Sequence, residues 1–167
     1  MNEIFERRSI RKYQNEKVPD ELIEKVIRAG MAAPSARNQQ LWHFIIVDDK
    51  KLIESIVELH PNGGTPLKES PVAIIVCGDL DLQKTEGFWV QDCSAATENM
   101  LIEAKYLGLG SIWIGIYPRE ERINGLKKLF SLPENVFPLS VVGLGYSAET
   151  PPNVDRYDKN KIHRNKW

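Results

Sequence analysis

The stretch Val72–Cys77, VAIIVC, is an unbroken run of apolar residues with no polar alternation. Such a run predicts a β-strand that is buried on both faces of its sheet. The nearly continuous apolar run at Trp42–Val47 predicts a second strand of this kind, and further strands are expected at 111–116 and 139–144. Because both faces of the sheet must then be covered, the sequence predicts a three-layer α/β or α+β sandwich around a central sheet.

Helical periodicity fills the segments between these strands. Apolar residues at three- and four-residue steps predict helices from Pro19 to just before Pro34, and at 50–59, 89–107 and 118–130. The longest of them, 89–107, is apolar on more than one side. That pattern fits either a central core helix or a helix at a subunit interface.

Composition narrows the class of protein. The 167 residues suit one domain spanning 1–167, ending in a polar tail from residue 150. A net charge of -1 gives no global preference for nucleic acid or an anionic membrane. No apolar run is long enough to cross a bilayer, and the first residues are too charged for a signal peptide, so we expect a cytoplasmic protein.

Cysteine and histidine usage bears on redox and metal chemistry. Cys77 and Cys93 lack a CxxC partner, which favours two inert core thiols in a reduced compartment, with one disulfide as the alternative. The three histidines show no ligand spacing, so no metal site is expected.

A basic run near the start, RRSIRKY at 7–13, combines three guanidinium groups, an ammonium and a hydroxyl. If the run is extended, Arg7, Ser9 and Arg11 point the same way. Forked guanidinium donors beside a hydroxyl suit a phosphate dianion. The alternative, on this run alone, is a solvated basic segment near a mobile terminus.

Further motifs follow in a defined order. After the RRSIR run come APSARNQQLW at 33–42, Gln91-Asp92 at the start of the longest helix, GLGSIWIG at 108–115 and, after Gly145-Tyr146, a tail containing Arg156. This series resembles the nitroreductase family of flavin enzymes, whose members open with RRSxR and continue with PSxxNxQPW. The resemblance covers essentially the whole chain.

The resemblance implies a nitroreductase-like fold with a central mixed sheet, a long dimer-interface helix, and a tail at 150–167 that wraps on the partner subunit. It also implies one tightly bound FMN per subunit, held at the interface of an intertwined homodimer. The implied activity is an NAD(P)H oxidoreductase of the ping-pong type, which passes a hydride from NADH or NADPH through flavin N5 to a nitroaromatic, quinone or similar acceptor. Because the flavin carries this chemistry, no side chain is assigned as a catalytic acid or base.

The resemblance also assigns residues. It places the FMN phosphate and ribityl side on Arg7, Arg8, Ser9 and Arg11, with Arg156 reaching the same phosphate from the tail. It implies flavin contacts from the partner subunit by Pro34, Ser35, Ala36, Asn38 and Gln40. It sets the turn beside the isoalloxazine edge at Ile114 and Gly115.

Three departures from the family pattern stand out. Leu41 replaces the proline of QPW, and Ile114 stands where longer members often carry glutamate. The chain is also too short for the helical insertion that roofs the substrate pocket in larger relatives, so an open or differently covered pocket is expected.

Other functions are compatible with the same motifs. The same flavin could serve a reductive dehalogenase or an enone reductase. The chain could instead be a flavin-binding sensor or store without efficient turnover, or an interaction domain that has lost the cofactor. A purified protein that is coloured and oxidises NADH would be a flavin enzyme, and not a sensor, a store or an interaction domain.

Overall fold

The computed structural model describes residues 2–167. In this part of the chain the strands are β1 (Trp42–Val47), β2 (Val72–Asp79), β3 (Gly110–Gly115) and β4 (Val136–Gly145). The helices are α1 (Glu3–Glu6), α2 (Asp20–Met31), α3 (Lys50–Leu59), α4 (Trp89–Tyr106) and α5 (Glu120–Leu129). Short 3-10 turns occur at Ala36–Asn38, Thr65–Glu69, Leu80–Leu82 and Lys159–Lys161. The predicted strands and helices are therefore confirmed, with small shifts at their ends.

The strands form one sheet in the order β1-β2-β4-β3. In place of the mixed sheet implied by the resemblance, every pair of neighbouring strands is antiparallel. β2 and β3 both run opposite to β4 and hence run in the same direction. They are not neighbours, because β4 lies between them. Parallel pairing occurs at the isolated bridge between Ser9 and Ser111.

β4 begins at Val136, three residues before its predicted start. Pro138 lies inside this strand, although proline has no backbone N–H to give to a ladder. The strand accommodates it opposite Cys77, where the register between β2 and β4 shifts.

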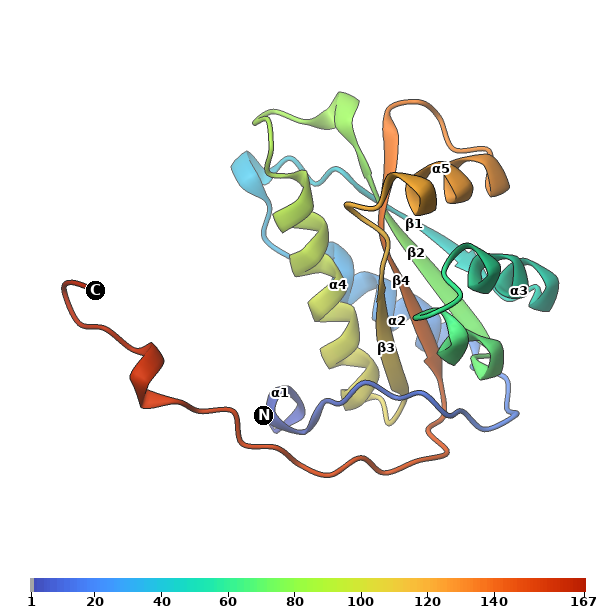
Figure 1. Ribbon diagram of the computed structural model, residues 1–167, viewed down its shortest axis with the longest axis horizontal. Coiled ribbons are helices and arrows are strands. Elements are labelled where there is room, and N and C mark those ends of the chain that lie inside the picture. Colours follow the sequence, from blue (N-terminus) through green and yellow to red (C-terminus); the bar gives the residue numbers. More distant parts are fainter. Residues whose placement is uncertain (1) are drawn as a thin grey trace.

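Helices cover both faces of the sheet. Figure 1 shows α2 and α4 on one side of the strands and α3 and α5 on the other. Side chains of β2 alternate between two buried clusters: Val72, Ile74 and Val76 pack toward α2 and α4, whereas Ala73, Ile75 and Cys77 pack toward α3 and α5. This double burial explains the unbroken apolar run and confirms the α+β sandwich.

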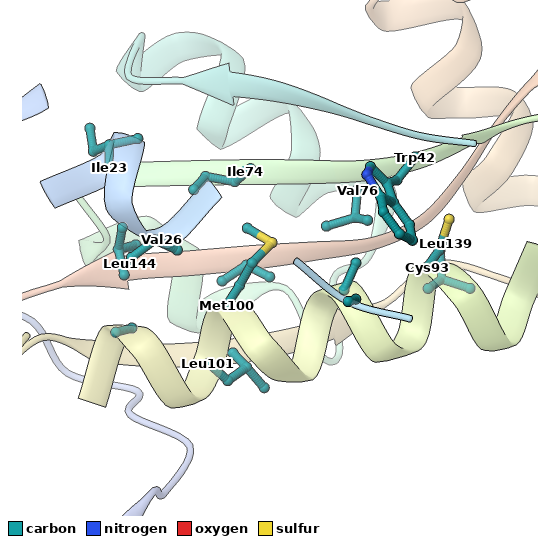
Figure 2. Close-up of a cluster of buried hydrophobic side chains, with 14 of the residues drawn as sticks. Ile23, Val26, Trp42, Ile74, Val76, Cys93, Met100, Leu101, Leu139 and Leu144 are labelled. Carbon is teal, nitrogen blue, oxygen red and sulfur yellow. The ribbon is translucent and has the colours of Figure 1, made fainter. Parts of the chain in front are cut away.

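The first cluster joins α2 and α4 to the sheet, and Figure 2 shows Met100 and Cys93 reaching from α4 toward the strands. α2 approaches α4 closely at Gly30, where a Cβ would lie 2.9 Å from Met100 Cγ. The opposite side of α4 is less covered, with Ile102 half-buried and Tyr106 exposed. Thus α4 is a core helix that also carries a partly uncovered apolar side.

The two cysteines lie on opposite faces of the sheet, Cys77 in the α3/α5 cluster and Cys93 in the α2/α4 cluster. Both are free and buried, and the Cys93 thiol is 3.5 Å from the Cys77 carbonyl oxygen, to which it donates. The structure therefore favours two core thiols over the disulfide alternative. Burial raises the pKa of each thiol to about 12.

From this burial we expect both thiols to be inert in the native protein. Ellman's reagent at mildly alkaline pH should leave the folded chain unlabelled and should label two thiols per chain after denaturation in guanidinium. Rapid labelling of the folded chain would contradict the assignment.

No helix within residues 2–167 is long and apolar enough to cross a membrane.

Candidate functional site

The basic segment at 7–13 lies along the edge of the sheet beside β3 and the end of β4. Ile10 donates its backbone N–H to the Ser111 carbonyl oxygen at 2.9 Å, and Tyr13 forms a bridge with Ser147. Both side chains are buried and anchor the segment. The backbone N–H groups of Arg11 and Lys12 donate to the Glu149 carboxylate, which fixes the segment while leaving both side chains exposed.

Arg7 and Arg8 are each held from within the chain. Arg7 Nε lies 3.2 Å from Glu98 Oε1 on α4. The guanidinium of Arg8 donates to backbone carbonyl oxygens of the N-terminal segment, at Phe5 (2.8 Å) and Arg7 (2.7 Å), and of the tail, at Pro152 (3.1 Å) and Val154 (3.4 Å). Carbonyl oxygens satisfy guanidinium donors without neutralising their charge. Arg8 therefore joins the N-terminal segment to the tail.

A hollow of about 640 Å³ lies between α1 and the tail, and Arg7, Arg8 and Arg156 all line it. A neighbouring hollow of about 550 Å³ is lined by Arg7 and Arg8 together with Lys105 and the turn at 108–110. The structure thus brings Arg156 to the same place as the two N-terminal arginines, as the resemblance implies. We call the hollow that contains Arg156 the arginine hollow.

Arg11 lies in a different cavity, of about 380 Å³, whose lining includes Ile114 and Gly115 from β3. We call it the Arg11 cavity. Since Arg7 turns toward Glu98 while Arg11 lines this second cavity, the single cluster expected from strand alternation is not formed. The side of Gly115 is open, because an added Cβ would meet no atom within 4 Å.

Sequence reasoning missed three residues around the Arg11 cavity. His60 and Asn62 line it, and Arg122 donates from Nη1 to the Gly115 carbonyl oxygen at 3.0 Å. The loop at 61–66 was recognisable from its prolines and glycines, but no spacing linked it to Arg11. Lys68 lines another cavity, with Tyr13 and Asp48, which fits an ordinary surface lysine.

The loop at 34–41 is fixed to the first turn of α4 by a buried carboxylate. Asp92 accepts from the Ala36 N–H at 3.0 Å and from Gln39 Nε2 at 2.5 Å. Gln39 in turn accepts, through Oε1, the backbone N–H groups of Lys84 (2.9 Å) and Thr85 (3.2 Å). Gln39 is therefore a structural residue that satisfies backbone groups.

This loop adopts backbone conformations that L-residues seldom take. Left-handed φ angles occur at Arg37 (50°), Asn38 (52°) and Gln40 (46°). Ser35 supports the loop, since its hydroxyl accepts the Gln40 N–H at 3.0 Å. Leu41, in place of the family proline, is fully buried. Such conformations persist only where surrounding contacts enforce them, and the Asp92–Gln39 pair provides those contacts.

The sequence pattern of the nitroreductase family matches residues 4–74 and 64–146. The chain belongs to the nitroreductase family.

Named relatives agree with this membership. The chain is 53% identical over 161 residues, 96% of this chain and 84% of the relative, to a protein of Methanothermobacter thermautotrophicus provisionally named an NADH dehydrogenase/NAD(P)H nitroreductase. It is 30% identical over 189 residues, 98% of this chain and 73% of the relative, to the FMN reductase [NAD(P)H] of Bacillus subtilis. A crystal structure of a provisionally named nitroreductase from Desulfovibrio desulfuricans in complex with FMN superposes with a TM-score of 0.85 at 28% identity, covering 99% of this chain and 96% of that one.

The two N-terminal motifs, at 7–13 and 33–42, contact different parts of α4. Asp92, which holds the 34–41 loop, is in the first turn, whereas Glu98, which binds Arg7, lies further along the helix. Neither the arginine hollow nor the Arg11 cavity includes a residue of 34–40 among its described lining. A single chain therefore does not bring together all the residues that the resemblance assigns to one flavin.

Proposed function

We propose that this chain is an FMN-dependent NAD(P)H oxidoreductase. The observation that carries the proposal is the Arg11 cavity, where a cationic side chain faces the open backbone of Gly115 on the edge strand of the sheet. The arginine hollow continues along the same N-terminal segment. The names of the relatives, an NAD(P)H nitroreductase and an FMN reductase, support the same activity.

The residues present fit FMN. The phosphate group is a dianion that needs fixed positive charge, and Arg7, Arg8 and Arg156 line one hollow, where they outnumber the carboxylates of Glu6 and Asp155. The ring system needs flat access and a polar edge, and the Arg11 cavity offers open backbone at Gly115 with Asn62 beside it. When bound, FMN supplies a ring that accepts a hydride at N5 from NADH or NADPH and passes electrons to a second substrate.

The chain's own residues would bind, orient and shield this group. With the ring in this cavity, the positive charge of Arg11 would stabilise the negative charge that the ring gains on reduction and so would favour the reduced form. Ile112, Trp113 and Ile114 form the apolar part of the cavity lining and keep water from one side. No side chain is needed as a proton donor or acceptor in this scheme.

The acceptor we propose is a nitroaromatic, a quinone or a similar conjugated electrophile. The test is steady-state NADH and NADPH oxidation with menadione or nitrofurazone, after an absorbance spectrum and a thermal-shift titration with FMN and FAD. A ligand that binds only the native state must raise the melting temperature. Reduction without turnover would favour a flavin sensor or store, turnover only on halogenated or enone substrates would favour those reductases, and a colourless protein unaffected by FMN would refute the proposal.

We also propose a homodimer in which the loop at 34–40 of one chain completes the flavin site of the other. The separation of the two motifs along α4 supports this arrangement. So does the tail, which leaves the body of the fold in Figure 1 and exposes large apolar side chains at Val154, Tyr157, Ile162 and Trp167. A groove of about 410 Å³ between α2 and β1 offers apolar surface and the carboxylates of Asp20 and Asp48 to a basic tail, while its third carboxylate, Glu24, is paired with Arg28.

Removing residues 150–167 is expected to convert a dimer into a monomer, because the exposed apolar side chains of the tail would no longer be there to pack on the partner subunit. Light scattering after gel filtration should give twice the 19.1-kDa mass for the full chain and the single mass for the shortened one. Full-length Arg156→Ala is the control that removes the guanidinium but keeps the tail. A shortened chain that remains dimeric would contradict the arrangement.

A further inference from the structure

We propose that His60 donates one hydrogen bond, from Nε2, to the ligand that occupies the Arg11 cavity. The identity of that ligand as FMN rests on the proposed function. The inference rests on the position of His60 in the cavity lining, on the hydrogen bond made by its other ring nitrogen, and on the charges around it.

The first argument concerns the tautomer of the imidazole. His60 Nδ1 accepts the backbone N–H of Gly63 at 3.1 Å, so its lone pair is engaged within the loop. A neutral imidazole carries its proton on the nitrogen that does not accept, which here is Nε2. The ring packs closely against Gly63, since a Cβ at that position would overlap Cε1 and lie 2.8 Å from Nε2. The loop therefore holds the ring through Nδ1 and leaves Nε2 as the protonated nitrogen of a residue that lines the cavity.

The second argument concerns charge. Burial lowers the pKa of His60, and the positive charge of Arg122 on α5 lowers that pKa further. Arg122 is not among the described lining residues of the cavity, which include the charged side chain of Arg11, from the N-terminal segment, and no aspartate or glutamate. The imidazole is thus neutral at pH 7 and offers one donor without adding a third positive charge.

The third argument is that one guanidinium, that of Arg122, acts on two residues of the cavity lining, Gly115 and His60. Arg122 holds the Gly115 carbonyl oxygen at 3.0 Å and also lies near enough to His60 to depress its protonation. The cavity thus pairs a permanent cation, Arg11, with a neutral donor, His60. Together they suit a ring with several acceptor atoms, of which some gain charge on reduction and others stay neutral.

Two isosteric variants separate the ligand contact from the loop contact. The side-chain oxygen of His60→Asn can replace Nδ1 as the acceptor for Gly63, whereas the amide nitrogen of His60→Gln can replace Nε2 as the donor into the cavity. We expect His60→Asn to weaken FMN binding by roughly 3- to 10-fold, the effect of one neutral hydrogen bond, and to shift the flavin midpoint potential. His60→Gln should stay within about twofold of wild type, a difference below one such bond.

The readouts are fluorescence titration of the apoprotein with FMN, spectroelectrochemistry of the loaded protein, and 15N NMR of the His60 ring in the wild-type apoprotein. The NMR spectrum should show Nε2 protonated and Nδ1 unprotonated at neutral pH, and it needs no variant to fold. A ring protonated on Nδ1, a His60→Asn variant that binds as wild type does, or equal losses in both variants would overturn the inference while leaving the proposed function intact. A wild-type protein that binds no FMN would refute both.

Discussion

Replacing Asp92 with alanine is expected to lower the free energy of unfolding by about 3 kcal/mol. Asp92 is only 5% exposed, and its carboxylate accepts from both the Ala36 N–H and the Gln39 amide. Its loss would leave these donors unsatisfied beside α4 and release a loop whose left-handed residues depend on it. Urea unfolding followed by circular dichroism measures the change.

The matched control is Asp92→Asn, which keeps the shape and one acceptor oxygen but removes the charge. We expect it to lose less stability than Asp92→Ala, because one of the two hydrogen bonds survives. If the loop at 34–40 contacts flavin in a partner subunit, both variants should also weaken FMN binding in the same order. An alanine variant as stable as wild type would show that the carboxylate does not hold the loop.

Replacing Arg11 with alanine is expected to weaken FMN binding by roughly 10- to 100-fold, the effect of one charge-assisted contact. The guanidinium lines the cavity beside Gly115, and its intrachain hydrogen bond, to the Ser9 carbonyl oxygen, is long at 3.3 Å. The side chain is therefore available to a ligand, and its removal should disturb the fold little. Fluorescence titration of the apoprotein measures the affinity, and thermal melting checks the fold.

Lys12→Ala is the control, because it removes the same charge from the neighbouring exposed position, which is not among the described lining residues of the Arg11 cavity. It should change FMN affinity by less than about threefold, as expected for a screened surface charge. Equal losses in Arg11→Ala and Lys12→Ala would indicate general electrostatic attraction in place of a specific contact.

Much of the fold follows from local pattern. The run at Val72–Cys77 predicted a strand covered on both faces, and alternate side chains of β2 do enter two separate cores. Strand order does not follow from such patterns, because it depends on pairing between distant segments. The place of β4 between β2 and β3 is of this kind, and it makes the sheet antiparallel.

Lining residues of the candidate site could be identified from the sequence where they belong to a local motif, but not where folding brings distant segments together. The basic run at 7–13 and Gly115 were identified from the sequence, and Arg11 and Gly115 do meet in one cavity. The ion pair between Arg7 and Glu98 could not be inferred, because the partner is 91 positions away on another element. The place of His60 in the cavity could not be inferred for the same reason. The loop that carries it there has a composition that indicates only a turn.

The carbonyl oxygens around Arg8 have a thermodynamic consequence. One guanidinium holds Phe5 and Arg7 near one chain end and Pro152 and Val154 near the other. Any anion that orders this side chain also orders both ends of the polypeptide. If the tail docks on a second subunit, coenzyme loading and subunit association must be reciprocally linked, each strengthening the other by the same factor.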